Sequence, residues 1–385
     1  MNFSRPTLHP SFVQNESQRS FVRRQIQIRT ALRAAPTERK VGAGESVAIP
    51  LTTVSEQGSF DAWIGVQFPT PGGGVTASLL VDSGSSTMIV PNGEDLVGVP
   101  GYTILGTAHE PWGCPANVVQ GPLQIVARDG SVYEIQGCVF YACTGNNSAG
   151  ERTANFGAGR ILPWSANGWN TPPGLNVTMQ SPLSYDTAHP YAELVYAPAG
   201  SLFSVSGEMV VNDESHLILH SSLPAGYTLL ELIPDIEWMA VVPQALTIGG
   251  QLTEWPGNVP SPIAMVDTGG GPVFLSDPHG AVYATAWPDT VVCPTWAAGS
   301  QGCNCVSDPL TIGLVGSDGA SSYSYTIDTA SMPAPVQGLT AVMCEVNQYM
   351  MGQQGMNVGG ITALFNRILI CYQGAQVGFA PRLAS

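Results

Sequence analysis

Short runs in which apolar and polar residues alternate recur along the chain, and Gly, Pro, Asn or Asp bounds most of them. The segments SVYEIQGCVFYAC (131–143) and ALTIGGQLTEW (245–255) are examples that are rich in aromatic and β-branched residues. A period of two residues is typical of β-strands, and the 3.6-residue spacing of amphipathic helices is scarce here. The pattern therefore predicts an all-β chain with a few short helices.

One apolar run ends in a carboxylate. In VDSGSSTMIVP (81–91), Asp82 follows the run Leu79–Val81 directly and precedes Ser-Gly-Ser-Ser. A buried carboxylate is costly unless hydrogen-bond donors surround it, so the small residues after Asp82 are expected to aim donors at it. The segment AMVDTGGGPVFLSD (264–277) repeats the pattern around Asp267, 185 positions later. This repetition predicts two similar β lobes, each presenting one aspartate at their junction.

The composition agrees with a β protein. The chain has 385 residues, of which 44% are hydrophobic and only 11% charged, against about 25% charged in usual soluble domains. Its 44 Gly and 31 Pro indicate many turns. Because no apolar run is long enough to cross a bilayer, we expect a soluble chain of one large or two ordinary domains, with no membrane partner.

Charge is distributed unevenly between the N-terminal arm and the rest of the chain. Residues 1–40 contain eight basic and two acidic residues, a net +6, whereas the other 345 residues carry −21. Such an arm either binds nucleic acid or a membrane, or docks on its own acidic body. We expect it to dock on the body and expect no nucleic-acid partner.

The cysteines give a weaker signal. Their eight positions are 114, 138, 143, 293, 303, 305, 344 and 371. No C-x-x-C spacing occurs and the chain has six His, so no metal site is expected. An even number of cysteines fits disulfides in an oxidising compartment, with the pairing left open. We therefore expect a secreted or lumenal protein; because the start MNFSRPTLHP shows no apolar leader, an intracellular protein is the alternative.

The two Asp-Ser/Thr-Gly motifs resemble those of the pepsin-like aspartic proteases, and the likeness extends over about residues 45 to 381. The final segment NVGGITALFNRILICYQGAQVGFAP (357–381) is similar to the end of that family. The resemblance implies a bilobal all-β fold with a cleft between the lobes, and a monomer without a cofactor. It divides the chain into a basic prosegment-like arm (1–40), an N-terminal lobe (41–225) and a C-terminal lobe (226–385).

The resemblance also assigns roles to individual residues. It implies that Asp82 and Asp267 activate one water for attack on a peptide carbonyl, and that Ser85 donates to the outer oxygen of Asp82. The residues expected to support the two carboxylates are Ser83, Gly84, Ser85, Thr268 and Gly269. Of these, Ser83 and Thr268 are expected to hydrogen-bond across the lobe interface.

Three positions depart from the family pattern. Gly270 stands where the family usually has Ser or Thr, so Asp267 is expected to lack the donor that Ser85 gives Asp82. The apolar segment behind the first motif is expected at Ile161-Leu162-Pro163, with Pro in place of Gly. The flap over the cleft is matched best by Trp112 and Gly113. Trp112 either covers the substrate or packs in the core of its loop.

Two classes of function remain open. The first is an aspartic endopeptidase that cleaves a peptide or protein substrate at acidic pH and is made as a zymogen. It is favoured because two carboxylates that share a site hold one proton between them and so supply an acid and a base together. The second is a pepsin-fold protein without ordinary proteolysis, either a binding module or a catalyst of small-molecule chemistry. The sequence contains neither the G-x-S-x-G nor the H-E-x-x-H motif of other hydrolases.

Overall fold

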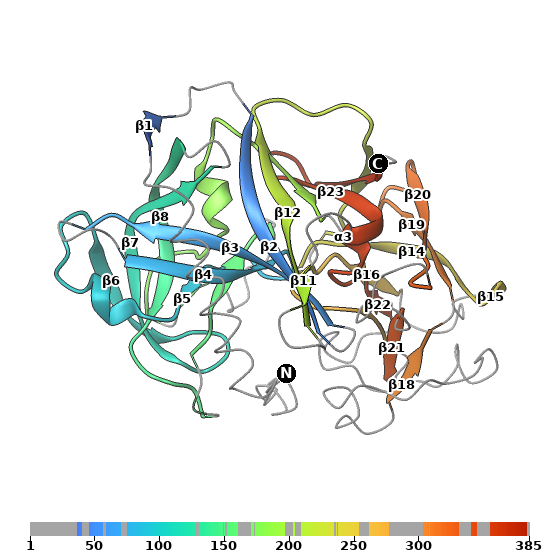
Figure 1. Ribbon diagram of the computed structural model, residues 1–385, viewed down its shortest axis with the longest axis horizontal. Helices are drawn as coiled ribbons and strands as arrows, with labels where there is room; N and C mark the ends of the chain where they lie inside the picture. Colours follow the sequence, from blue (N-terminus) through green and yellow to red (C-terminus); the bar gives the residue numbers. More distant parts are fainter. Residues whose placement is uncertain are drawn as a thin grey trace.

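The computed structural model of this protein contains two β-sheets, and the described strands all belong to one or the other (Figure 1). The structure describes residues 37–40, 46–56, 59–70, 75–127, 131–148, 150, 152–160, 171–172, 174–196, 203–204, 209–234, 236, 238–253, 262–276, 303–307, 309–330, 340–344 and 355–382. The all-β prediction is confirmed: the helical segments within these residues are short, namely η2 (Gly93–Leu96), η3 (Pro182–Tyr185) and α3 (Thr362–Phe365).

The larger sheet has 15 strands among the described residues. They are β1 (Thr37–Lys40), β2 (Val47–Glu56), β3 (Ser59–Phe68), β4 (Val75–Asp82), β5 (Ile89–Val90), β6 (Thr103–His109), β7 (Pro115–Val126), β8 (Ser131–Cys143), β9 (Asn155–Gly157), β10 (Tyr191–Val195), β11 (Phe203–Ser204), β12 (Met209–His220), β13 (Thr228–Glu231), β23 (Asn366–Cys371) and β24 (Gln376–Pro381). Most neighbours are antiparallel, and the order along the sheet runs β13-β24-β23-β10-β12-β2-β3-β4-β9-β5-β8-β7-β6.

The smaller sheet has nine strands among the described residues, ordered β18-β21-β17-β22-β16-β14-β19-β20 with β15 beside β14. Their bounds are β14 (Ala240–Ile248), β15 (Gln251–Thr253), β16 (Ile263–Met265), β17 (Val273–Ser276), β18 (Cys303–Val306), β19 (Leu310–Val315), β20 (Ser322–Ile327), β21 (Ala341–Cys344) and β22 (Gly355–Asn357). The last two strands of the chain, β23 and β24, return to the larger sheet, where β23 pairs with β10. The lobe boundary at residues 225–226 stays a prediction, and the larger sheet runs across it.

Strand β8 illustrates how the sequence pattern follows burial. Its first half alternates between buried and exposed residues, whereas Val139–Cys143 are buried throughout. The continuous run is explained by pairing, because β8 lies between β7 and β5 at this end. A strand covered on both sides by neighbours and on both faces by side chains reads as an unbroken apolar run.

The end of the basic arm reaches the body of the protein. Strand β1 pairs in parallel with β8, with Thr37 opposite Ser131. Residues 1–36 lie outside the described residues, so the expected docking of the whole arm stays a prediction. No helix among the described segments is long and apolar enough to cross a membrane.

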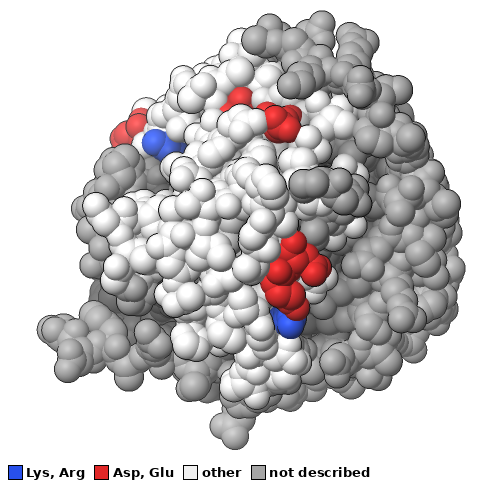
Figure 2. All heavy atoms as spheres, turned by 90° about the vertical axis from the view of Figure 1, so that its left-hand side faces the viewer, with Lys and Arg blue, Asp and Glu red and all other residues white. Residues whose placement is uncertain are grey.

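Low charge is also visible on the surface. Figure 2 shows the face of the larger sheet near β6 as mostly uncharged, with acidic side chains gathered in a few small groups. Inside, four buried cysteines form no disulfide, namely Cys114, Cys138, Cys143 and Cys371. Disulfide pairing of all eight cysteines is therefore not confirmed.

Candidate active site

The two aspartates of the repeated motifs lie in loops of equivalent construction, one from each sheet. Strand β4 pairs in parallel with β9, with Leu80 opposite Asn155, and β16 pairs in parallel with β22, with Met265 opposite Asn357. In both cases the asparagine faces the residue two positions before the aspartate. The local pairing is thus repeated in the two halves, as the repeated sequence motif requires.

Four hydrogen bonds join the two loops. The Ser83 amide donates to Thr268 Oγ1 (3.1 Å), and the Thr268 amide donates to Ser83 Oγ (3.0 Å). Each hydroxyl then donates across the interface to a main-chain carbonyl, Ser83 to Val266 (2.9 Å) and Thr268 to Val81 (3.2 Å). These are the cross-loop bonds expected of Ser83 and Thr268. Because every donor has an acceptor in the other loop, neither loop can shift without breaking its partner's bonds.

The glycines of the motifs allow the two carboxylates to approach each other. The Gly84 amide donates to Asp82 Oδ1 (2.8 Å), and the Gly269 amide donates to Asp267 Oδ1 (2.9 Å). A Cβ atom on Gly84 would lie 2.4 Å from Asp267 Cγ, and one on Gly269 would lie 2.6 Å from Asp82 Cγ. Each glycine therefore supports its own aspartate and makes room for the other.

The outer carboxylate oxygens are held by two asparagines that the sequence analysis missed. Asn155 Nδ2 donates to Asp82 Oδ2 (3.2 Å), and Asn357 Nδ2 donates to Asp267 Oδ2 (2.6 Å). Both asparagines are buried. The expectation that Asp267 lacks a side-chain donor is therefore wrong, because Asn357 provides one.

Two further expectations change as a result. Ser85, expected to donate to Asp82, instead accepts a hydrogen bond from Asn155 (2.8 Å) and lies 3.5 Å from the Thr87 carbonyl. Gly270, expected to weaken the site, creates space: a Cβ atom there would lie 3.3 Å from Asn357 Nδ2 and 3.4 Å from Asp267 Oδ2. The absence of a side chain at Gly270 thus leaves room for the Asn357 amide beside Asp267.

The environment of the pair favours retention of a proton. Burial, followed by the negative charge of Asp267 and a hydrogen bond with it, raises the pKa of Asp82 well above its usual range. The Gly84 amide and Asn155 act in the opposite direction because they donate to the ionised form. Burial and the neighbouring carboxylate prevail, so Asp82 holds its proton more tightly than an ordinary aspartate does.

Comparisons with known proteins support this architecture at the level of the fold. No family model matches the chain, and no curated protein matches it. Among solved structures, the crystal structure of basic 7S globulin from soybean is similar over 88% of this chain and 96% of that chain, with a TM-score of 0.53 and 12% identity. The fold is bilobal and pepsin-like. At this identity the likeness carries the fold alone.

In this pepsin-like fold, strand β9 backs the first aspartate, and its position corrects the assignment made from sequence. The segment expected there, Ile161-Leu162-Pro163, lies outside the described residues. The register instead makes Asn155–Gly157 equivalent to Asn357–Gly359. A Cβ atom on Gly157 would lie 2.2 Å from the Thr87 amide nitrogen, so this strand fits closely against the loop that follows Asp82.

The residues matched to the flap, Trp112 and Gly113, lie in the loop between β6 and β7. Trp112 is half-buried and packs against a small apolar cluster that includes Tyr141 and Met179. Gly113 is exposed, with φ of 95°, a left-handed conformation that suits glycine. The packing agrees with the second of the two roles weighed for Trp112, and its contact with a substrate stays a prediction.

Proposed function

We propose that this protein is an aspartic endopeptidase that hydrolyses peptide bonds at acidic pH. The observation that carries the proposal is the pair Asp82 and Asp267, both 8% exposed and set on two loops joined by four hydrogen bonds. A binding module has no need of two matched carboxylates that disfavour each other's ionisation. A catalyst that needs an acid and a base at one point requires such a pair of carboxylates.

The arrangement suits activation of water between the carboxylates. With one proton on the dyad, the ionised carboxylate takes a proton from the water while the protonated one donates to the carbonyl oxygen of the substrate. The Gly84 and Gly269 amides, together with Asn155 and Asn357, keep both carboxylates oriented during this exchange. Preorganised donors of this kind avoid reorganisation when charge moves.

The substrate class, activation and location belong to the same proposal. The net charge of −21 on residues 41–385 falls as carboxylates protonate, which suits work in an acidic, secreted or lumenal setting. The arm of +6 is proposed as a prosegment, and the pairing of β1 with β8 supports contact between the arm and the body. An extended peptide is proposed to bind in the cleft between the lobes.

A second candidate is a pepsin-fold protein that binds a ligand or transforms a small molecule without ordinary proteolysis. It is favoured by one observation, the packing of Trp112 into its own loop cluster. The solved structure reported above is also named as a globulin, and that name states no peptidase activity.

The two candidates are separated by incubating the full chain with an unfolded protein over a series of acidic pH values. Mass analysis of both components is expected to show substrate fragments, shortening of the chain near residues 36–45, and loss of both in Asp82→Asn and Asp267→Asn. Fragments that persist in these variants would contradict the dyad mechanism. Intact substrate at every pH, with a folded chain, would favour the second candidate.

A further inference from the structure

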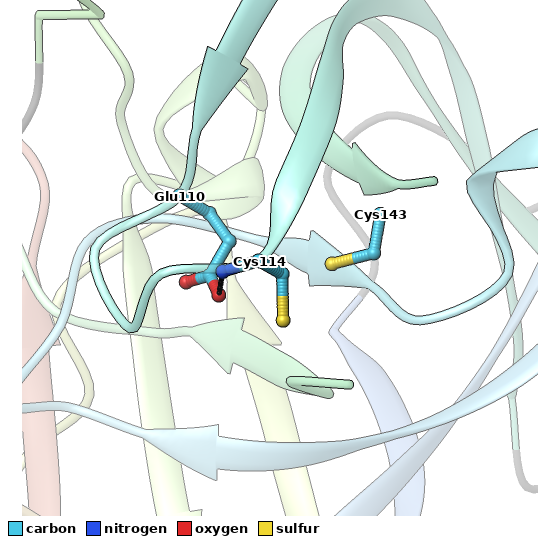
Figure 3. A group of neighbouring side chains, drawn as sticks. All are labelled: Glu110, Cys114 and Cys143. Carbon is cyan, nitrogen blue, oxygen red and sulfur yellow. Dashed lines mark hydrogen bonds between the residues drawn. The ribbon is translucent and has the colours of Figure 1, made fainter. Parts of the chain in front are cut away.

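A cluster of three potential metal ligands lies at the end of the β6–β7 loop, away from the dyad chemistry described above. Glu110, Cys114 and Cys143 are 2%, 0% and 0% exposed, and their ligand atoms all lie within 4.8 Å of one another. Figure 3 shows Glu110 and Cys114 on the loop and the Cys143 side chain pointing toward them from the end of β8. No metal site is expected from the sequence, because it has no C-x-x-C spacing and only six His.

The loop is built to hold the carboxylate against the thiols. Glu110 Oε2 accepts from the Trp112 amide (2.7 Å), and Oε1 accepts from the Cys114 amide (2.7 Å) and from Thr153 Oγ1 (3.1 Å). These bonds close the turn around Glu110 and fix the direction of its carboxylate. Oε2 accepts a single bond and so keeps one lone pair for a further ligand.

The strand register brings the sulfurs together. Ala116 pairs with Cys143 across β7 and β8, and Cys114 directly precedes β7, so the turn that carries Glu110 and Cys114 meets the end of β8. Sulfurs this close either share a ligand or form a disulfide, and the carboxylate oxygen within the same 4.8 Å favours a shared ligand.

We propose that Glu110, Cys114 and Cys143 bind one soft divalent cation, with Zn²⁺ as the best fit. Zinc accepts thiolate and carboxylate ligands in a tetrahedral arrangement, and Zn–S bonds of about 2.3 Å place two sulfurs roughly 3.8 Å apart. That separation is compatible with the cluster. A neutral oxygen completes the set, either a water or the Thr153 hydroxyl, which lies 3.8 Å from Cys114 Sγ.

The electrostatic surroundings fit a bound cation. Two thiolates and one carboxylate carry three negative charges, and a bound Zn²⁺ offsets two of them.

A metal at this point would fasten the loop that carries Trp112 to the end of β8. It would also fix the segment at Thr153, two residues before Asn155, through the bond of Thr153 to Glu110. The proposal is independent of proteolysis, because none of the three ligands touches Asp82 or Asp267 in any described contact.

The test begins with the unmodified full chain, purified with reductant and without chelator. We expect about one zinc per chain by elemental analysis. After exchange for Co²⁺ under reducing conditions, we expect the near-ultraviolet band of thiolate-to-cobalt charge transfer and the intense visible bands of a tetrahedral site. The absence of both zinc and the charge-transfer band would overturn the proposal without any variant.

Variants locate the site. Cys114→Ser and Cys143→Ser are expected to remove the charge-transfer band or most of it, and Glu110→Gln to weaken zinc retention about 10-fold or more. Cys371→Ser is the matched control, because it removes another buried free thiol from a different strand and should leave the metal content unchanged. A mass 2 Da below the dithiol form, with both Cys114 and Cys143 blocked to alkylation, would show a disulfide and overturn the metal site.

Discussion

The loops that carry Asp82 and Asp267 hold the same carboxylate geometry with different residues. Both aspartates receive a glycine amide on the inner oxygen and an asparagine amide on the outer one. The first loop also contains Ser85, which accepts from Asn155, whereas the second has only hydrogen at Gly270. Both loops therefore place an amide donor at the outer carboxylate oxygen. The position beside that donor differs, because it is Ser85 in the first loop and Gly270 in the second.

The two asparagines are also satisfied to different degrees. Asn357 donates to Asp267 at 2.6 Å and accepts from the Gly359 amide at 2.9 Å, so both ends of its amide are fixed. Asn155 divides its donors among Asp82, Ser85 and the Thr87 carbonyl, and its Oδ1 has no partner among the described residues. The outer oxygen of Asp267 is therefore held by one short hydrogen bond from Asn357. The outer oxygen of Asp82 is held by an asparagine that also donates to two other groups.

The largest expected effect comes from removing either carboxylate's charge. Asp82→Asn and Asp267→Asn should each lower kcat/KM for peptide hydrolysis by about 10³-fold or more, because the acid and the base act as one unit. Equal losses would confirm that the two loops contribute equally to the chemistry. Steady-state cleavage of a peptide substrate at the pH optimum measures this, with circular dichroism to verify folding. A variant that keeps more than a tenth of the activity would contradict the shared role.

The next effect separates the two asparagines. Asn357→Ala should reduce activity by about 10–100-fold, since a hydrogen bond to a charged group contributes about 1.5–3 kcal/mol. Asn155→Ala should cost less, because the Ser85 hydroxyl remains beside Asp82 and is released from Asn155. In Asn155→Ala the acid limb of the pH profile should move to higher pH, because loss of a donor to the ionised form raises the pKa of Asp82 further.

This prediction has a readout that simple destabilisation would not give. A lower kcat in Asn155→Ala without a shift of the pH profile would indicate that this asparagine only supports the fold. A larger loss in Asn155→Ala than in Asn357→Ala would contradict the comparison between the shared and the single donor.

A smaller effect tests whether serine and asparagine are alternative solutions. Gly270→Ser alone should lower activity modestly, because its Cβ would lie 3.3 Å from Asn357 Nδ2 and crowd it. Combined with Asn357→Ala, the same serine should restore part of the lost activity, because the vacated space lets its hydroxyl donate to Asp267. The measurement is a double-mutant cycle on kcat/KM. Additive losses would refute the exchange, and Gly270→Ala in the same background is the control without a hydroxyl.

The sequence revealed the parts of this site that are local. Asp82 and Asp267 each follow an apolar strand and precede small residues, so their role could be predicted from consecutive letters. The asparagines could not, because Asn155 is 73 positions from Asp82 and Asn357 is 90 from Asp267. Their signal was nonetheless present, as Asn-Phe-Gly at 155–157 and Asn-Val-Gly at 357–359.

The same limit applies to the fold and to the thiol cluster. The alternation in residues 131–143 predicted a strand, but only the pairing of β8 with both β5 and β7 explains why its second half is buried throughout. Cys114 and Cys143 lie 29 positions apart in sequence, and only the pairing of β7 with β8 brings the turn that carries Glu110 and Cys114 to the end of β8. Long-range pairing supplies information that spacing within a motif cannot.

The smallest expected effect concerns stability, and it tests the burial of Asp82 directly. Its pKa is raised in the folded protein by burial and then by Asp267, so the protein binds this proton more tightly when folded than when unfolded. The associated stabilisation is complete below the unfolded pKa and is lost as the pH rises through the raised folded value. Asp82→Asn cannot ionise, so its melting temperature relative to the parent should rise by a few degrees between strongly acidic and neutral pH. Thermal unfolding of both proteins over that range measures the difference, with Asp95→Asn as the control for removal of an exposed carboxyl group. A difference that is constant with pH would mean that burial of Asp82 costs no more when it is charged than when it is neutral, and would remove the electrostatic basis for a shared proton at the dyad.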